Sequence, residues 1–514
     1  MNASAQARLE LLALEGGVAR FGTTKNGHAI SVLDLVGSEA SMSTADDATQ
    51  EELLAGRAQF LNAQTAPFQV LVRTEPVDLD GHLRRVQARA DLLAEPLASV
   101  ARDYVAFVQA LAFQRTLLER HCYVVLPAQT ERPVVSLSRR LRGVFSRGSL
   151  SDEVGDDAIP AELARRLGAR SEHVARQLGR SGLRTRRLSS QQLAELLHRC
   201  WSPELARVQR LREELGAYTT LAVGGRRLAL QDQPRERQPE RNAETAADPA
   251  DEYQKDDGLF GLGARTLADL IAPSACEIRR DHVRLDAHYA RVLAVTAYPR
   301  LVSPGWLSLL VESDLPIELS LHVRPLASAD MVRALGVQIA RLQSSRLAAL
   351  RGERVGDPER EIALEDAERL RERLQRGEER LFAVSLYLLL RARSPRDLDE
   401  LTRRVEEQLD ALLAHSRRAL WEQERGFMSC LPQAQDALLV PRNLDTSALA
   451  ATLPFVGPSL AMETGMLAGV AGTGQTPVLL DPFDRSLDNA NQVVIAPAGA
   501  GKSFFCKLLA LRQL

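Results

Sequence analysis

The sequence predicts an α+β region followed by the beginning of a P-loop α/β domain. Three observations predict this fold class. Strand patterns and helix patterns alternate along most of the chain in units of strand, helix, strand, helix. Near the C-terminus, the apolar run 493–496 predicts a buried strand, and a glycine-bearing loop follows it. A segment with helical periodicity comes next, and this order of strand, loop and helix is typical of a phosphate-binding P-loop.

The first part of the chain contains strands and helices in turn. An N-terminal β-rich stretch extends to about Val36, and residues 41–47 have the composition of a helix start. The segments expected next are a helix over 51–62, a strand over 68–74 ended by Pro76, a helical run over 79–119, a strand over 121–126, a helix over 160–179, and a helix from the capping box of Ser189 and Gln192 to about Trp201.

After an insertion, this pattern partly repeats. Residues 231–257 lose their hydrophobic side chains, which indicates a flexible insertion. The segments expected after it are a strand over 317–325, a helical run over 330–376 broken at 356–358, a strand over 381–390 and a helix over 396–415. Both strands that end in proline lead into long helices. These units fit either an internal pseudo-repeat or a coincidence between two common motifs.

The patterns also predict a division into domains. A chain of 514 residues is long enough for about three domains. The expected parts are residues 1–230 as the first half of an N-terminal α+β domain, 231–257 as the insertion, 258–425 as the second half of that domain, and 426–514 as the start of a P-loop domain.

The glycine-bearing loop is the candidate nucleotide site. Small residues let backbone amides close around a phosphate, Lys502 can reach the β and γ oxygens, and the Ser503 hydroxyl can ligate Mg²⁺. ATP and Mg²⁺ are therefore the expected cofactors, with Lys502 as the candidate catalytic residue and Ser503 as the metal ligand. The expected binding residues are Ala496, Pro497, Ala498, Gly499, Ala500, Gly501, Lys502, Ser503 and Phe504.

Two features qualify this site. Ala496 stands where the pattern G-x-x-x-x-G-K-[ST] has glycine, and alanine is tolerable there if φ is negative. The alternative is a Gly-Lys-Ser turn in an ordinary loop, but the strand before it and the helix after it favour a P-loop. A P-loop ATPase also needs a carboxylate for Mg²⁺ and a water-orienting residue from later strands. Asp481 ends an apolar run but precedes the loop, so we expect an N-terminal part of an ATPase that ends within its first nucleotide-binding helix.

Composition excludes several classes of protein. The formal net charge is −2, so the global balance does not demand nucleic acid or a charged membrane surface. The five cysteines are scattered, which argues against a metal cluster and for a reducing compartment. No signal-peptide pattern opens the chain, and the longest apolar stretch, 381–390, is too short to span a bilayer. We therefore expect a cytoplasmic protein.

A family resemblance rests on short segments in a fixed order. The segments are Tyr298-Pro299, Gly305-Trp306-Leu307, Leu321-His322-Val323-Arg324-Pro325, Ser429-Cys430-Leu431-Pro432, Leu453-Pro454-Phe455, Gly465-Met466-Leu467-Ala468-Gly469, Pro477-Val478-Leu479-Leu480-Asp481 and Asn489-Ala490-Asn491, which lead into the loop. From about Ala58 onward the chain resembles the conjugative type IV secretion ATPases of the VirB/TraC type. The departures are Ala496 and the absent catalytic half.

The resemblance implies a motor ATPase of the HerA/FtsK-like superfamily with a RecA-like P-loop domain. It implies a location peripheral to the inner face of the cell membrane, channel components as partners, and ATP hydrolysis that powers pilus assembly and substrate transfer. A hexameric homo-oligomer follows by family analogy alone.

Other candidate sites have simpler explanations. The glycines of 469–474 lie between two apolar strands, so a hairpin turn is favoured over a nucleotide loop. Asp281, His282, Asp286 and His288 could form a metal site, but the alternation of Val283, Leu285 and Ala287 indicates a strand whose two faces separate these residues. Structural histidines are therefore favoured over a metal site. The arginines of 139–147 and 184–187 favour a solvated surface over contact with acidic lipid or nucleic acid. No direct nucleic-acid site is identified.

Three functions therefore remain open. The first is a secretion motor, of which this chain holds a docking domain and the P-loop. The second is a DNA-pumping coupling ATPase of the same superfamily; such proteins usually carry N-terminal membrane helices, which this sequence lacks. The third is a non-catalytic module that docks on the channel.

Overall fold

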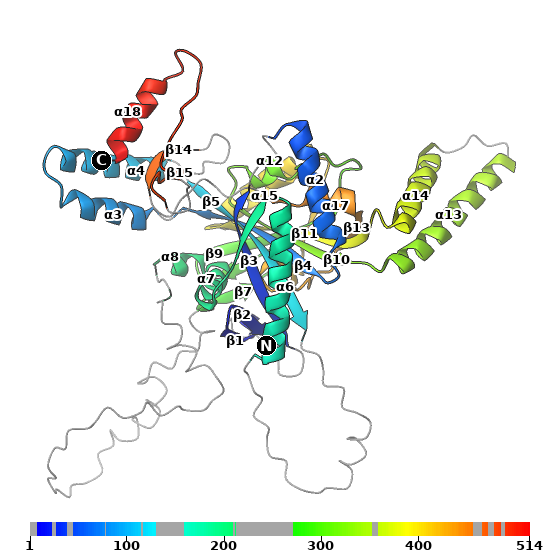
Figure 1. Cartoon of the computed structure of the whole chain (residues 1–514). Helices are drawn as coiled ribbons and strands as arrows, with labels where there is room; N and C mark the ends of the chain where they lie inside the picture. Colours follow the sequence, from blue (N-terminus) through cyan, green and yellow to red (C-terminus); the bar gives the residue numbers. More distant parts are fainter. Residues whose placement is uncertain are drawn as a thin grey trace, which may run out of the picture. The chain divides into compact units, whose positions relative to one another are not determined.

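The structure of the chain is a computed structural model. It describes residues 8–22, 27–38, 45–77, 79–114, 117–129, 159–208, 211, 271–351, 358–455, 465–470, 477–484 and 489–513. Figure 1 labels the helices and strands that these residues form. The chain divides into two compact units. The smaller unit comprises Met1–Val32, Pro127–Ala169 and Leu188–Glu277, and the larger comprises Leu33–Leu126, Arg170–Arg187 and Ile278–Leu514.

The domain division stays a prediction. Its boundaries at 230 and 257, with the insertion between them, lie outside the described residues. The boundary at 425 falls inside helix α16 (Gln423–Cys430).

An antiparallel sheet forms the core of the larger unit. Its strands follow the order β3 (His28–Ser38), β5 (Leu118–Gln129), β4 (Phe68–Pro76), β10 (Ile317–Pro325), β11 (Leu381–Ala392), β9 (His288–Ala297) and β8 (Val283–Leu285). Three short strands pair with members of this order: β6 (Leu183–Arg187) with β3, β12 (His415–Arg418) with β9, and β13 (Arg442–Asp445) with β11. This mixture of helices with a large antiparallel sheet confirms the α+β class at a coarse level.

Two helical hairpins interrupt the sheet in the same way. Strand β4 leads into α3 (Asp80–Ala90) and α4 (Leu97–Gln114) before β5, and β10 leads into α13 (Ser328–Arg351) and α14 (Pro358–Arg376) before β11. In the β4–β5 pair Pro76 lies opposite Leu118, and in the β10–β11 pair Pro325 lies opposite Phe382. Because β4 and β10 also pair with each other antiparallel, the repeat that the sequence raises as one reading is present in the topology.

Two predicted helices end differently in the structure. The run predicted over 79–119 is two helices, because Pro96 disfavours helical conformation in the residue before it. Residue 119, the last of the predicted run, already belongs to β5. The helix predicted over 396–415 is α15 (Pro395–Ala411). Leu413 then adopts a left-handed φ of 56° and His415 begins β12.

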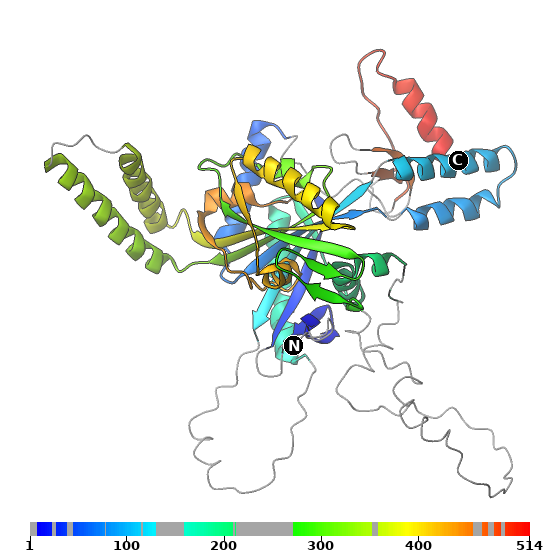
Figure 2. The same ribbon diagram turned by 180° about the vertical axis from the view of Figure 1, so that it is seen from behind.

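Alternate side chains of β11 lie on opposite faces of the sheet. The even-numbered residues from Phe382 to Leu390 join a buried cluster with Leu398, Val405 and Leu409 of α15. Helices α2 (Asp47–Asn62), α12 (Ser308–Val311) and α17 (Thr446–Thr452) also belong to this unit. Figure 2 shows the helix α15 lying along β11 and β9, which it contacts.

The opposite face of the central strands carries polar groups. Gln69 donates to Ser320 Oγ at 2.8 Å, and His322 Nε2 lies 2.6 Å from the carbonyl oxygen of Ser429. Tyr387 donates to Asp436 at 2.6 Å. These bonds hold residues 429–440 on the sheet. That segment contains the Ser-Cys-Leu-Pro motif of the resemblance.

A buried ionic group crosses neighbouring strands. Glu318 lies 3.3 Å from Arg73 on β4 and 2.7 Å from Arg391 on β11. The side chains of Arg73 and Glu318 are 1% and 5% exposed. Arg73 also pairs with Glu75 at 2.7 Å. Glu318 therefore partners two arginines, and burial of a charge without a partner is costly.

The smaller unit contains β1 (Leu11–Glu15), β2 (Val18–Phe21) and the first residues of β3, paired in that order. Helix α7 (Ser190–Trp201) begins at the predicted capping box, in which Ser189 and Gln192 exchange hydrogen bonds. Residues of α6 (Ala161–Arg180) pack on Val18 and Ala29. The remaining elements are α8 (Pro203–Val208) and β7 (Cys276–Ile278), where the chain passes to the larger unit. None of the described helices combines the length and apolar composition that a bilayer crossing requires.

Candidate functional site

The glycine-bearing loop leads directly into helix α18 (Lys502–Gln513), as predicted. Gly499 and Gly501 have φ values of +81° and +82°. Residues with a Cβ rarely adopt this left-handed conformation. An added Cβ on either glycine would meet open space. The backbone conformation, and not crowding, therefore requires glycine at these two positions.

Lys502 closes the loop. Its Nζ donates to the carbonyl oxygens of Ala496 at 2.6 Å and Pro497 at 2.7 Å. The N–H of Ala500 also bonds to the Pro497 oxygen, at 3.3 Å. An ammonium group has three donors, so one N–H of Lys502 remains beside these two bonds. The lysine thus ties down loop carbonyls while its charge stays at the helix start.

The N-terminus of α18 offers further donors. The first N–H groups of a helix have no partner within it, and the helix dipole places partial positive charge there. The first bond of the helix runs from the N–H of Phe505 to the Gly501 oxygen at 2.9 Å. The N–H groups of Lys502, Ser503 and Phe504 point to no acceptor within the described part of the chain. Ser503 itself is exposed. The lysine and the amides without a helical partner are donors that fit a triphosphate, and the exposed hydroxyl of Ser503 fits a ligand of Mg²⁺.

The strand predicted before the loop is absent, which corrects the sequence interpretation. Residues 493–496 carry no strand assignment, and Val493 and Ile495 are 82% and 89% exposed. An extended segment becomes a stable strand only when a neighbour satisfies its N–H and C=O groups. No strand of the described residues pairs with this segment.

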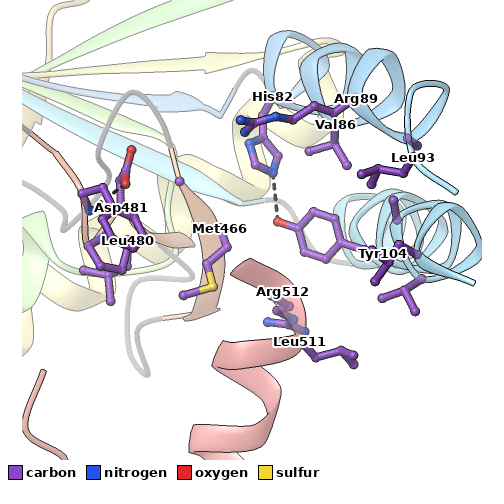
Figure 3. A pocket seen from close by; sticks show the side chains of 17 residues that line it. His82, Val86, Arg89, Leu93, Tyr104, Met466, Leu480, Asp481, Leu511 and Arg512 are labelled. Atoms are coloured by element: carbon purple, nitrogen blue, oxygen red, sulfur yellow. Dashed lines mark hydrogen bonds between the residues drawn. The ribbon is translucent and has the colours of Figure 1, made fainter. Parts of the chain in front are cut away.

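The far end of α18 is held by a second set of contacts (Figure 3). Arg512 donates to the carbonyl oxygen of Leu467, and its guanidinium lies over the rings of Tyr104 and Phe107, 5.6 and 5.2 Å from their centres. The Tyr104 hydroxyl accepts from the Leu467 N–H at 2.9 Å and also lies 2.9 Å from His82 Nε2. Arg512 therefore joins α18 to α4 and to strand β14 (Met466–Val470).

A cavity of about 270 Å³ lies beside these contacts. Its walls come from the α3–α4 hairpin, β14, the end of β15 (Pro477–Leu480) and the last turn of α18. Burial raises the pKa of Tyr104. Burial, and secondarily the charge of Arg85, lowers the pKa of His82, which favours a neutral imidazole at pH 7.

The sequence did not indicate this cluster of side chains. The aromatic residues at positions 104 and 107 of one helix are three residues apart and so share a face, and Arg512 lies in the last turn of α18, where a cation is favourable. These signals are visible in the sequence, but their meeting across more than 350 residues is not.

The other candidate sites have structural roles. The strands around the glycines of 469–474 pair antiparallel, as a hairpin requires, although the turn itself lies outside the described residues. His282 Nδ1 lies 3.0 Å from its neighbour Asp281, which also pairs with the buried Arg291. Among the described residues, no group of three acidic, histidine or cysteine side chains is arranged to hold a metal ion. The five cysteines are free thiols, three of them buried.

The structure describes only one of the two arginine-rich stretches. Residues 139–147 lie outside the described residues. In β6, Arg184 and Arg186 are exposed, and Arg186 lies 3.4 Å from Asp34. This pair at the edge of the sheet is consistent with the solvated surface that the sequence favours.

Comparison with known protein families relates part of the chain to one of them. Residues 23–203 match the family model of the archaeal TraC-like domain. The matched region begins before β3, ends after α7 and does not include the loop of residues 496–503. At a coarse level it supports a relation to a TraC-type, conjugation-related ATPase family. A search of curated proteins found no match.

Proposed function

We propose that this chain belongs to a cytoplasmic ATPase of the VirB/TraC type, which energises a type IV secretion or conjugation channel. In this proposal the sheet domain docks on channel components at the inner face of the membrane, and the loop of residues 496–503 binds ATP and Mg²⁺ at the start of a RecA-like domain. The protein would act as a homo-oligomer. The TraC-like match and the ordered motifs that lead to the loop support the assignment.

One observation carries the nucleotide-binding part of the proposal. Lys502 spans the loop to Ala496 and Pro497, while two left-handed glycines shape the backbone between them. In this arrangement the amides of residues 502–504 and the lysine charge converge on the start of α18. Lys502 would bind the β and γ phosphates, and Ser503 would ligate Mg²⁺. Bound ATP would supply the phosphoryl group whose transfer drives a motor, and Mg²⁺ would neutralise the charge that develops on it.

A second candidate is a non-catalytic docking module. The position of the family match favours it, because residues 23–203 form part of the sheet region and leave the loop outside. In that case the chain binds the channel without binding nucleotide.

Nucleotide binding separates the two functions. The test is isothermal titration of purified 1–514 with Mg-ATP, repeated on Lys502→Ala and on Lys507→Ala. Lys507 is an exposed cation of the same helix, so its variant controls for loss of charge alone. A charge-assisted hydrogen bond contributes about 1.5–3 kcal/mol, so Lys502→Ala is expected to weaken binding about 10- to 100-fold, while Lys507→Ala changes it little. Absence of binding to the unmodified chain would leave the docking module.

A further inference from the structure

Helix α18 is anchored at one end only. Leu509 is the one buried side chain among its described residues, and the side chains from Ser503 to Lys507 are exposed. A helix of 12 residues is a rod of roughly 18 Å. Its N-terminal end carries the nucleotide loop, and its C-terminal end carries Arg512. The orientation of the loop therefore depends on contacts at the opposite end of the rod.

Those contacts converge on one side chain. Arg512 bonds to the Leu467 oxygen and covers the rings of Tyr104 and Phe107. Tyr104 in turn accepts from the Leu467 N–H at 2.9 Å. The arginine, the tyrosine and the backbone of β14 thus form a closed set in which each member contacts the other two. Figure 3 shows Arg512 beside Tyr104. We refer to Arg512, Tyr104, Phe107 and Leu467 as the Arg512 clamp.

The α3–α4 hairpin shares this anchor. Leu79, Leu83, Val105 and Val108 of the hairpin region pack with Leu467 and Leu479 of the β14–β15 pair in one buried cluster. The hairpin follows Pro76 and so extends directly from β4, the central strand that pairs with β10. A displacement of α18 would reach β14 and α4 through the clamp, and from there the sheet.

We propose that Arg512 is a positioning residue for the nucleotide loop, and that the clamp transmits nucleotide binding to the α3–α4 hairpin. The proposal rests on the nucleotide-binding function proposed for residues 496–503. Arg512 acts on the loop through α18 and does not touch the nucleotide. Such coupling is reciprocal. If nucleotide binding changes the conformation of the hairpin, a change in the hairpin alters the affinity for nucleotide by the same free energy.

Hydrogen exchange with Mg-AMP-PNP as the probe tests this on the full 1–514 chain. In the unmodified protein, nucleotide should slow exchange in peptides from 496–513 and change it in peptides from 97–111. In Arg512→Ala the slowing at 496–504 should remain, the change at 97–111 should vanish, and affinity should fall about fivefold. Tyr104→Phe, which keeps the ring under Arg512 but loses the hydroxyl bonds, should reduce the response of α4. Lys507→Ala, on the same helix, should behave as the unmodified protein.

The outcomes distinguish the two proposals. A nucleotide response at 496–504 with none at 97–111 in the unmodified protein overturns the coupling and leaves nucleotide binding intact. An Arg512→Ala variant that keeps the response of α4 also overturns it. If the unmodified protein shows no response at 496–504 and no measurable affinity, the proposed function fails, and the coupling fails with it.

Discussion

The Nζ of Lys502 lies 2.6 Å from the carbonyl oxygen of Ala496. Ala496 therefore takes part in the loop through its backbone, and its methyl group has no role in this contact. The departure from glycine at this position, which weakens the sequence motif, leaves the lysine bond intact. At this position the contact with Lys502 requires only a backbone carbonyl oxygen, which alanine provides as well as the glycine of the pattern.

Replacing Ala496 by glycine should leave nucleotide affinity nearly unchanged. The carbonyl oxygen remains, and glycine adds only backbone freedom, so the expected change is less than about threefold. Titration with Mg-ATP measures it, with Lys502→Ala as the variant that should lose affinity. A tenfold change in Ala496→Gly would mean that the methyl group shapes the loop.

Replacing Ser503 by alanine should remove the contribution of Mg²⁺ to nucleotide binding. The hydroxyl is exposed at the start of α18, where it is the side-chain oxygen next to Lys502. We expect the variant and the unmodified chain to bind ATP equally in EDTA, and only the unmodified chain to bind more tightly when Mg²⁺ is added. An equal gain with Mg²⁺ in both proteins would exclude Ser503 as the ligand.

Local signals predicted much of the fold. The capping box at Ser189 starts a helix, and Pro76 and Pro325 end equivalent strands. These features depend on residues a few positions apart, and local hydrogen bonding and proline geometry decide them. Pro96 also carries local information. The periodicity of apolar residues alone predicts one continuous helical run, but the structure has two helices with Pro96 between them.

Features that depend on distant partners were not predictable in the same way. Residues 493–496 have a strand-like composition, but the described residues supply no neighbouring strand, so Val493 and Ile495 stay exposed. The Arg512 clamp joins segments far apart in sequence, and nothing in the spacing of arginine and aromatic residues shows that they meet. The nucleotide loop was found because its chemistry lies within eight consecutive positions, 496–503.

Replacing Gly465 by alanine should destabilise the β14–β15 pair. Gly465 has a φ of +118°, and a Cβ there would lie 2.5 Å from the carbonyl carbon of Leu480. Backbone cannot move aside as a flexible side chain can, so we expect a local loss of at least about 2 kcal/mol. Faster hydrogen exchange in β14 measures it. Gly469→Ala is the matched control, because its Cβ meets nothing within 4 Å. Equal effects in the two variants would contradict the argument.

Replacing Glu318 by glutamine should destabilise the larger unit by about 3 kcal/mol. The variant removes the carboxylate that Arg73 and Arg391 share, although Arg73 keeps its pair with Glu75. The side chains of Arg73 and Arg391 are 1% and 12% exposed. The shift in the urea midpoint gives the magnitude. Glu372→Gln removes a carboxylate of similar type from an ion pair whose two side chains are about 60% exposed, at 58% and 61%, and should cost less than about 0.5 kcal/mol. A loss in Glu318→Gln no larger than in this control would mean that the network contributes little.

Replacing His322 by glutamine should reduce the dependence of stability on pH. Burial is the main influence on His322 and lowers its pKa below the ordinary value of 6.5, although the bond to the Ser429 oxygen and the charge of Asp436 oppose the shift. Below about pH 6.5 the unfolded chain therefore binds a proton that the folded chain resists. Stability from this group is present above pH 6.5 and is lost as the pH falls.

Thermal unfolding between pH 7.5 and 5.5 measures this effect. Glutamine keeps an N–H donor for Ser429 but does not titrate, so the variant should start less stable and lose less on acidification. His82 and His198 are also buried with lowered pKa values, but they titrate alike in both proteins, so the difference between the two profiles isolates His322. Parallel profiles would mean that the imidazole of His322 does not become charged with unfolding in this pH range.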